Sequence, residues 1–335
     1  MWTRLQFSKR EAKRAGVVLA GGMPVHEHPH ALAVLNNWRS AHGYPLHVIS
    51  QHLQRIATDV ESSAVVARRF KRLPSIVHKL ERFPSLHLAK MQDVAGCRVI
   101  MPSIEQVRDV DALLRAALSP HRLVRHNDYL AEPKSSGYRG LHLVYGFHDD
   151  GAAQWNGLHV EIQMRTVLEH AWSTAVETAG LVTAQTLKSS RGHALWLRFF
   201  QLASALIAAR EHTAPVPEAP TSLRDLRAEL KRIDDKIGLL QTLTESSRAF
   251  DQSVHAVHDG GFVLLALNPH ARSLSVTGFA TFAAAAAAYE AAEVRMGANM
   301  DVVLVGVNAV KRLENAYPNY FLNADPFVQF MNDEL

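Results

Sequence analysis

The sequence predicts an α+β protein in which a β-sheet is flanked by helices. Three observations indicate this class. The segment "HVEIQMRT" (159–166) alternates apolar and polar residues, as a strand with one buried face does. From Val167 onward, apolar residues recur at the spacing of an amphipathic helix. A Pro-rich stretch, 213–221, then separates this region from a second group of strand-like segments, so a helical segment and a small α/β C-terminal unit are expected after it.

Composition excludes several classes of protein. The chain has 335 residues, 47% of them hydrophobic and 20% charged, which is typical of a globular protein with room for more than one domain. No apolar run reaches the roughly 18 residues of a membrane helix, and the N-terminus lacks the apolar core of a signal peptide. The single cysteine, Cys97, excludes internal disulfides. We therefore expect a cytoplasmic protein without a membrane partner.

The distribution of charge is more informative than the formal net charge of +4. Between Arg68 and Arg82 there are six Lys or Arg residues against one acid, Glu81. A cluster this local favours a polyphosphate ligand over a long duplex, because duplex binding needs positive charge spread over a wide surface. A solvated helix face would show the same pattern, and both readings stay open at this point.

The N-terminal half is expected to contain both helices and strands. Ser8 followed by Glu11 predicts a capping box that opens a short basic helix. Segments 30–40 and 46–82 are also expected to be helical. "MQDVAGCRVIM" (91–101) predicts a strand, and "GLHLVYGF" (140–147) pairs with 160–166 in a predicted hairpin.

The C-terminal half begins with two expected helices, one after Thr166 and one over 194–212. Leucines and isoleucines spaced three and four apart then form a heptad seam in 222–250, which packs either within its own chain or against a second copy. Three strand-like segments with an alanine-rich helix follow. The predicted domains are 1–44 (helical extension), 45–212 (catalytic), 213–221 (linker), 222–250 (heptad helix) and 251–335 (small α/β unit).

Several residues have the chemistry needed to handle a nucleoside triphosphate. Mg²⁺ prefers carboxylate and phosphate oxygens, cations neutralise the phosphates, and a base stacks on an aromatic ring. Asp93 precedes one predicted strand and Glu161 lies on the polar face of another. Lys134 and Arg139 flank the loop "PKSSGYRGLH", which contains Tyr138. Taken singly, each has an ordinary alternative as a turn, solvent-facing or loop residue.

Their order along the chain resembles a known family. "RFKRLPSIVHKL", "DVAGCRVI", "DYLAEPKSSGYRGLHLVY" and "VEIQMRTVLEHAW" are similar to the synthetase domain of the RelA/SpoT family, the alarmone synthetases, over about residues 45–185. The resemblance implies a mixed β-sheet like that of nucleotidyltransferases. It also implies magnesium-dependent transfer of the β,γ-pyrophosphate of ATP to a ribose 3′-hydroxyl.

The resemblance also implies roles for individual residues. Asp93 matches the Mg²⁺-binding aspartate, and Glu161 matches a second carboxylate that binds metal or activates the hydroxyl. The residues implied to bind ATP are Arg69 and Lys71, helped by Lys79 and Arg98. The residues implied to bind the acceptor are Tyr138, by stacking on its base, and Lys134, Arg139 and His142, by contacting its phosphates. Gln163 and Arg165 are expected to support Glu161.

The function implied is an ATP pyrophosphokinase that makes (p)ppGpp from GDP or GTP. Only about 45 residues precede the similar segment, too few for the hydrolase domain of bifunctional relatives, so no hydrolase activity is expected. The loop reads G-Y-R-G where the family leads us to expect G-Y-R-S, so the acceptor stays open. The alternative acceptors are the tRNA 3′ end, with the basic helix near Lys9 as a contact, or adenosine nucleotides.

Those alternative acceptors fit a toxin–antitoxin or phage-defence protein whose C-terminal unit neutralises or regulates it. That unit could instead mediate oligomerisation, bind a regulatory ligand or protein, or simply complete a core. A third reading is an inactive nucleotide sensor. The presence of both Asp93 and Glu161 argues against the sensor, which needs no pair of metal-binding carboxylates. A homo-oligomer is neither required nor excluded.

Overall fold

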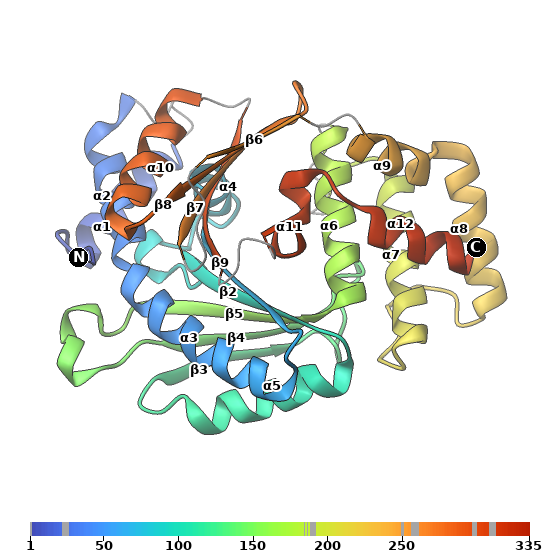
Figure 1. Ribbon diagram of the computed structural model, residues 1–335, viewed down its shortest axis with the longest axis horizontal. Coiled ribbons are helices and arrows are strands. Elements are labelled where there is room, and N and C mark those ends of the chain that lie inside the picture. The colour runs from blue at the N-terminus through green and yellow to red at the C-terminus, as the bar shows by residue number, and fades with distance from the viewer. Residues whose placement is uncertain are drawn as a thin grey trace.

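The computed structural model describes residues 2–21, 27–183, 185, 187, 192–248, 251–255, 261–296, 300–307 and 313–335. Within these ranges, nine strands form one sheet in the order β3-β4-β5-β2-β1-β9-β7-β8-β6 (Figure 1). The strands are β1 (Val65–Phe70), β2 (Ala95–Met101), β3 (Arg122–Asp128), β4 (Leu141–Gly146), β5 (His159–Thr166), β6 (Asp251–His255), β7 (Phe262–Asn268), β8 (Ser273–Phe279) and β9 (Asp301–Val307).

The sheet is mixed. β4 and β5 form the predicted antiparallel hairpin, with Leu141 opposite Met164. β2 runs parallel to β5, and β1 lies antiparallel to β2 on its other side. The predicted α+β class with a mixed sheet is therefore confirmed. The predicted burial of β5 is confirmed as well, because Val160, Ile162 and Met164 are all 0% exposed.

Helices cover both faces of the sheet. α3 and α5 lie on one face and α6 on the other, where α7, α8, α9 and α12 extend the helical layer (Figure 1). The helices are α1 (Lys9–Leu19), α2 (Pro29–Ala41), α3 (Gly43–Val60), α4 (Leu73–Arg82), α5 (Ile104–Ala117), α6 (Val167–Val182), α7 (Ala194–Arg210), α8 (Leu223–Ile237), α9 (Leu239–Arg248), α10 (Phe282–Met296), α11 (Leu313–Ala316) and α12 (Asp325–Glu334), with short 3₁₀ turns η2 (Leu88–Lys90), η3 (Asp150–Trp155) and η7 (Pro318–Phe321). Within the described ranges, no helix is both long and apolar enough to cross a bilayer.

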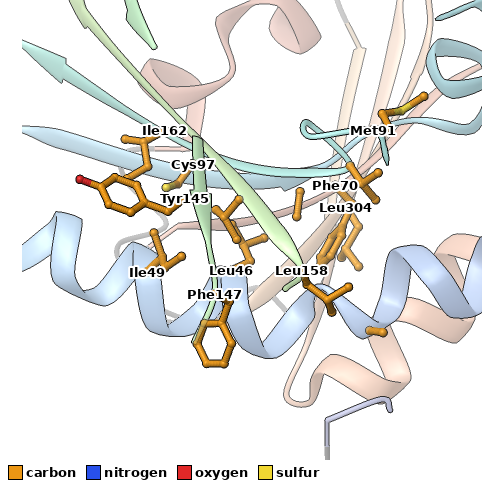
Figure 2. Packing of buried hydrophobic residues seen from close by; sticks show 14 of the residues in the cluster. Leu46, Ile49, Phe70, Met91, Cys97, Tyr145, Phe147, Leu158, Ile162 and Leu304 are labelled. Atoms are coloured by element: carbon orange, nitrogen blue, oxygen red, sulfur yellow. The ribbon is translucent and has the colours of Figure 1, made fainter. Parts of the chain in front are cut away.

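The largest hydrophobic core lies between the sheet and α3. Figure 2 shows Leu46 and Ile49 of α3 beneath strand residues such as Cys97 and Ile162. Leu304 of β9 belongs to the same cluster. One core therefore joins residues from the two ends of the sequence and packs one face of the sheet on α3.

The predicted helix over 46–82 is wrong in its middle. α3 ends at Val60, and β1 occupies Val65–Phe70 before α4 begins at Leu73. The polar break at 61–63 and the β-branched pair Val65 and Val66 favour a strand, but the following basic residues obscured the alternation. β3 and β6 were also not predicted from the sequence.

The heptad seam packs within its own chain. α8 ends at Ile237, and the next residue, Gly238, has a φ of 59° in the left-handed region. The predicted single helix over 222–250 is therefore two helices, α8 and α9. Leu226, Leu230 and Ile233 of α8 are buried in the same cluster as α7. Residues 249 and 250 lie outside the described ranges.

The C-terminal strands extend the sheet of the first half. The predicted strands correspond to β7, β8 and β9, and the predicted alanine-rich helix corresponds to α10. β9 pairs antiparallel with β1, with Gly306 opposite Arg68. Residues 251–335 were predicted as a separate small unit, and whether they fold on their own stays a prediction, but their strands share one sheet with β1–β5.

Candidate active site

Four adjacent strands direct polar side chains to the same face of the sheet. Arg69 of β1 lies opposite Gly96 of β2, which in turn lies opposite Glu161 of β5. Gln163 of β5 lies opposite both Arg98 of β2 and His142 of β4. Because opposite residues share a face and alternate residues along a strand return to it, strand pairing alone gathers these side chains. The face away from α3 is the one they occupy.

A cavity of about 760 Å³ lies over this face. Eleven of the twelve predicted site residues line it: Arg69, Lys71, Lys79, Asp93, Arg98, Lys134, Tyr138, His142, Glu161, Gln163 and Arg165. Trp172 of α6 and Phe200 of α7 form part of its wall, and so do Tyr317 and Tyr320 from the segment after β9. A volume of this size accommodates a nucleotide-sized ligand.

Glu161 is held on both of its carboxylate oxygens. Oε1 lies 3.0 Å from His142 Nδ1, and Oε2 accepts a hydrogen bond of 2.7 Å from Gln163 Nε2. Burial favours the neutral acid, but His142 and the hydrogen bonds from His142 and Gln163 outweigh it and hold the pKa of Glu161 well below its usual range. Glu161 is therefore ionised, and each oxygen retains a lone pair for a further partner.

The hydrogen bonds continue from Glu161 to Tyr138. The Tyr138 hydroxyl lies beside His142 Nε2 and accepts a hydrogen bond of 2.7 Å from Arg165 Nη2. Nδ1 of His142 faces the Glu161 carboxylate and donates to it, and Nε2 faces the Tyr138 hydroxyl. Burial raises the pKa of Tyr138, so its hydroxyl is protonated. We call this the Tyr138–His142–Glu161 chain.

Gly96 allows β2 to lie close to β5 at Glu161. A Cβ on Gly96 would lie 3.2 Å from the main-chain oxygen of Glu161 and 3.9 Å from its Oε2. A side chain there would push against the strand that carries the carboxylate. The absence of a side chain at Gly96 thus allows the close approach of β2 to β5 at Glu161.

Asp93 lies just before β2 and binds two lysines with one oxygen. Oδ2 accepts from Lys71 Nζ at 2.9 Å and from Lys79 Nζ at 2.8 Å. Burial favours the neutral acid, but the two lysines outweigh it and lower the pKa of Asp93. The other oxygen, Oδ1, is buried and has no hydrogen-bond partner among the described residues.

These carboxylates fit a Mg²⁺ ion. Mg²⁺ is commonly bound by one or two carboxylates together with substrate phosphates and water. Asp93 has one carboxylate oxygen without a partner among the described residues, and Asp93 and Glu161 both line the cavity. In the described part of the chain, no group of three or more His, Cys, Asp or Glu side chains could hold a metal by itself. Substrate phosphates and water would complete the coordination.

Other cations surround the cavity. Arg98 donates to the main-chain oxygen of Ala316 at 2.7 Å, with its guanidinium 5.8 Å from the Tyr317 ring centroid. Burial lowers the pKa of Arg98 to about 10. Lys134 Nζ lies 5.0 Å from the centroid of Tyr138. The cavity is thus bordered by positive charge on both sides of the carboxylates.

Arg139 does not line the cavity, so the structure places it away from the phosphate contacts predicted for it. Its side chain is buried and donates to the main-chain oxygen of Ala214 at 2.8 Å and to Thr213 Oγ1. Glu169 Oε1 lies 3.8 Å away. Tyr138 faces the cavity and the next residue points away from it, toward the end of α7. Arg139 anchors the Tyr138 loop.

Arg139→Gln is therefore expected to destabilise the fold as well as weaken acceptor binding. Removing a buried cation beside Glu169 should lower the free energy of unfolding by about 2–4 kcal/mol, and the loosened Tyr138 loop should raise the acceptor KM several-fold. Thermal unfolding and acceptor titrations measure both, with the exposed Arg210→Gln as control. A raised acceptor KM at unchanged Tm would instead support the predicted direct contact between Arg139 and the acceptor phosphates.

The sequence analysis assigned no role to three of the residues that line the cavity. Arg72 belongs to the basic cluster but had no assigned role, and it lines the cavity next to Lys71. Tyr317 and Tyr320 lie far along the chain, where no local pattern links them to the strands they reach. Only the pairing of β9 with β1 brings that segment to the site.

Comparison with known proteins identifies the region that carries the site. Residues 68–180 match a family described as "Region found in RelA / SpoT proteins". This region is similar to RelA/SpoT proteins, and on that basis we call residues 68–180 the RelA/SpoT domain. It contains all twelve predicted site residues, whereas Tyr317 and Tyr320 of the cavity wall lie outside it.

Two proteins of Bacillus subtilis (strain 168) are similar to the RelA/SpoT domain. The chain is 34% identical over 111 residues to the GTP pyrophosphokinase YjbM and 32% identical over 111 residues to the GTP pyrophosphokinase YwaC. Each match covers 32% of this chain and 52% of the relative, so the chain spans about half the length of the curated relatives it matches.

Solved structures show a partial likeness. Small alarmone synthetase 1 from Bacillus subtilis, bound to its product pppGpp, is 26% identical with a TM-score of 0.44, covering 51% of this chain and 89% of that one. Small alarmone synthetase 2 from the same organism is 21% identical with a TM-score of 0.45, covering 52% and 93%.

Proposed function

We propose that the protein is an ATP pyrophosphokinase that transfers the β,γ-pyrophosphate of ATP to the ribose 3′-hydroxyl of GDP or GTP. The observation that carries this proposal is the pairing of two ionised carboxylates, Asp93 and Glu161, in one cavity bordered by cations and by Tyr138. Support also comes from the RelA/SpoT domain and from two relatives named GTP pyrophosphokinase.

The reaction exchanges one phosphorus–oxygen bond for another. The 3′-oxygen of the acceptor forms a bond to the β-phosphorus of ATP, and the bond from that phosphorus to the oxygen shared with the α-phosphate breaks. AMP leaves with the shared oxygen, and the hydroxyl loses its proton. Such a transfer depends on positioning and on stabilising negative charge.

The residues of the cavity fit these needs. Arg69, Lys71 and Lys79 would bind the phosphates of ATP, and Asp93 and Glu161 would hold Mg²⁺, which neutralises charge on the transferred group. Glu161 would also accept a hydrogen bond from the 3′-hydroxyl and orient it. Its low pKa favours this orienting role over storing the proton. The Tyr138–His142–Glu161 chain fixes the carboxylate while the reaction proceeds.

Acceptor identity can be tested by offering each candidate separately. Purified protein is incubated with γ-labelled ATP and Mg²⁺ together with GDP, GTP, ATP or bulk tRNA. Label moving to GDP or GTP is the expected result. Label moving to tRNA or to ATP alone would replace the guanine acceptor by the corresponding alternative. Labelled product that persists on further incubation without ATP would agree with an absence of hydrolase activity.

Two substitutions at Tyr138 separate its ring from its hydroxyl. Tyr138→Ala removes the stacking surface and should raise the acceptor KM about 5- to 100-fold, since stacking on an aromatic ring contributes about 1–3 kcal/mol per base. Tyr138→Phe keeps the ring but loses the contacts with His142 and Arg165, so it should lower kcat while leaving the acceptor KM nearly unchanged.

Steady-state kinetics with both substrates varied measures these effects. ATP binding should change less than acceptor binding in either variant. Equal loss of ATP and acceptor binding in Tyr138→Ala would contradict the stacking role.

A further inference from the structure

Arg72 has a counter-charge that comes from outside the RelA/SpoT domain. It lies in the turn between β1 and α4, next to Lys71, and lines the cavity. Its guanidinium forms an ion pair with Asp301, the first residue of β9. The Tyr320 hydroxyl also donates to Asp301, at 3.4 Å. The partner of Arg72 is thus supplied and positioned by a segment more than 200 residues away in the chain.

The other cations at this end of the cavity are paired differently. Lys71 and Lys79 both bind Asp93, which is itself a proposed Mg²⁺ ligand. Metal binding by Asp93 would draw its charge toward the ion and release the lysines to phosphates. Asp301 is not part of the catalytic set, so nothing in the reaction neutralises it. The ion pair uses Arg72 Nη1, so a phosphate that engages both terminal nitrogens of the guanidinium competes with Asp301 for it.

The surroundings of Arg72 suit a phosphate group. A guanidinium binds phosphate with two parallel hydrogen bonds, and Arg72 lies at the start of α4 on the edge of the cavity. The side chain of Arg72 is 28% exposed and that of Asp301 12%, so the pair is not sealed in the core, and Arg72 lines the cavity.

A second acid, Glu293, fixes the turn. Glu293 of α10 accepts from the main-chain N–H of Leu73 at 3.0 Å. Both of its oxygens also accept from Arg39, at 3.0 and 2.7 Å. This buried pair positions the turn on α10, so Arg72 itself is held at the cavity edge whichever anion it binds.

We propose that Arg72 is a further binding residue for the polyphosphate of ATP, and that Asp301 competes with this polyphosphate for the Arg72 guanidinium. The inference rests on the proposed function, because it requires ATP to occupy this cavity. In consequence, the charge at the start of β9 sets the affinity of the RelA/SpoT domain for its donor nucleotide.

Binding measurements on single and double variants test the proposal. The ligands are α,β-methylene ATP, in which the bond to be broken cannot react, and inorganic tripolyphosphate, which has no base. Asp301→Asn keeps an acceptor for Tyr320 but removes the charge, so both ligands should bind about 3- to 10-fold tighter. Arg72→Gln should weaken both about 10-fold. Adding Asp301→Asn to Arg72→Gln should change nothing further.

Controls separate binding from folding. Asp235→Asn, at an exposed surface pair, should match wild type in binding and in Tm. Arg72→Lys provides a second variant that keeps the charge but loses the two-hydrogen-bond geometry, and it should weaken both ligands less than Arg72→Gln does.

Several results would overturn the proposal. One is an Asp301→Asn variant that binds either ligand no more tightly than wild type. Another is an equal gain of affinity from Asp301→Asn in the Arg72→Gln background, because Asp301 would then act without Arg72. If wild type binds both ligands and the variants do not differ, this inference fails and the proposed function stands. If wild type binds neither, both fail.

Discussion

Glu161→Gln should abolish pyrophosphate transfer while leaving ATP binding nearly intact. The substitution keeps the size of the side chain but removes the charge that orients the 3′-hydroxyl and helps to hold the metal. Loss of such a group costs about 10²- to 10⁴-fold in rate. ATP affinity should stay within a few-fold of the wild-type value. The cations proposed to bind its phosphates lie on β1, on α4 and in the turn between them, and they remain in place.

The measurement is single-turnover transfer from γ-labelled ATP together with equilibrium binding of ATP. The matched control is Glu132→Gln, an exposed glutamate on the loop before Tyr138, which should behave as wild type. Gln163 can rotate its amide to present an oxygen to the new side chain, so folding should be preserved and Tm should confirm it. Transfer surviving in Glu161→Gln would remove the proposed role of Glu161.

Asp93→Asn should reduce pyrophosphate transfer about as strongly as Glu161→Gln does. In contrast, it should strengthen the binding of ATP in the absence of metal. Its unpartnered oxygen is the best candidate ligand for Mg²⁺, so transfer should fall by about 10²-fold or more. Asp93 also holds Lys71 and Lys79 at 2.9 and 2.8 Å. Removing its charge frees both lysines, and ATP without metal should then bind more tightly than to wild type.

Binding of ATP in the presence of EDTA and the Mg²⁺ dependence of transfer measure the two effects. Asp109→Asn, an exposed aspartate of α5, serves as control. A variant that keeps the wild-type Mg²⁺ dependence and maximal rate would contradict the assignment of Asp93. Weaker metal-free binding would mean that Asp93 supports the lysines structurally instead of competing with phosphate for them.

Strand alternation explains why much of the site could be predicted. The pattern of 159–166 places Glu161, Gln163 and Arg165 on one face and three apolar residues on the other, and the structure shows that arrangement. The position of Asp93 at the entry to β2 followed from the polar break before an apolar segment. Local periodicity therefore predicted which face of β5 carries Glu161, whereas the roles predicted for Asp93 and for the cations came from the resemblance to the RelA/SpoT family.

The failures have equally local causes. β1 was taken for helix because its basic residues broke the apolar alternation, although Arg69 reaches the site from that strand. Arg139 was assigned to the acceptor by resemblance to the family's motif. That motif does not indicate which way each side chain of the loop points, so the buried position of Arg139 could not be predicted. The contribution of Asp301 depends on β9 pairing with β1, and a pairing across more than 200 residues leaves no trace in either segment alone.

We expect the cavity holding Asp93 and Glu161 to transfer pyrophosphate. The most direct test is to incubate the full chain with ATP, GDP and Mg²⁺ and to identify the products by mass. The expected products are AMP and a guanosine nucleotide carrying a new diphosphate on its 3′-oxygen, in equal amounts, with neither formed by Glu161→Gln. Release of ADP and phosphate instead, or products that persist in Glu161→Gln, would contradict this expectation.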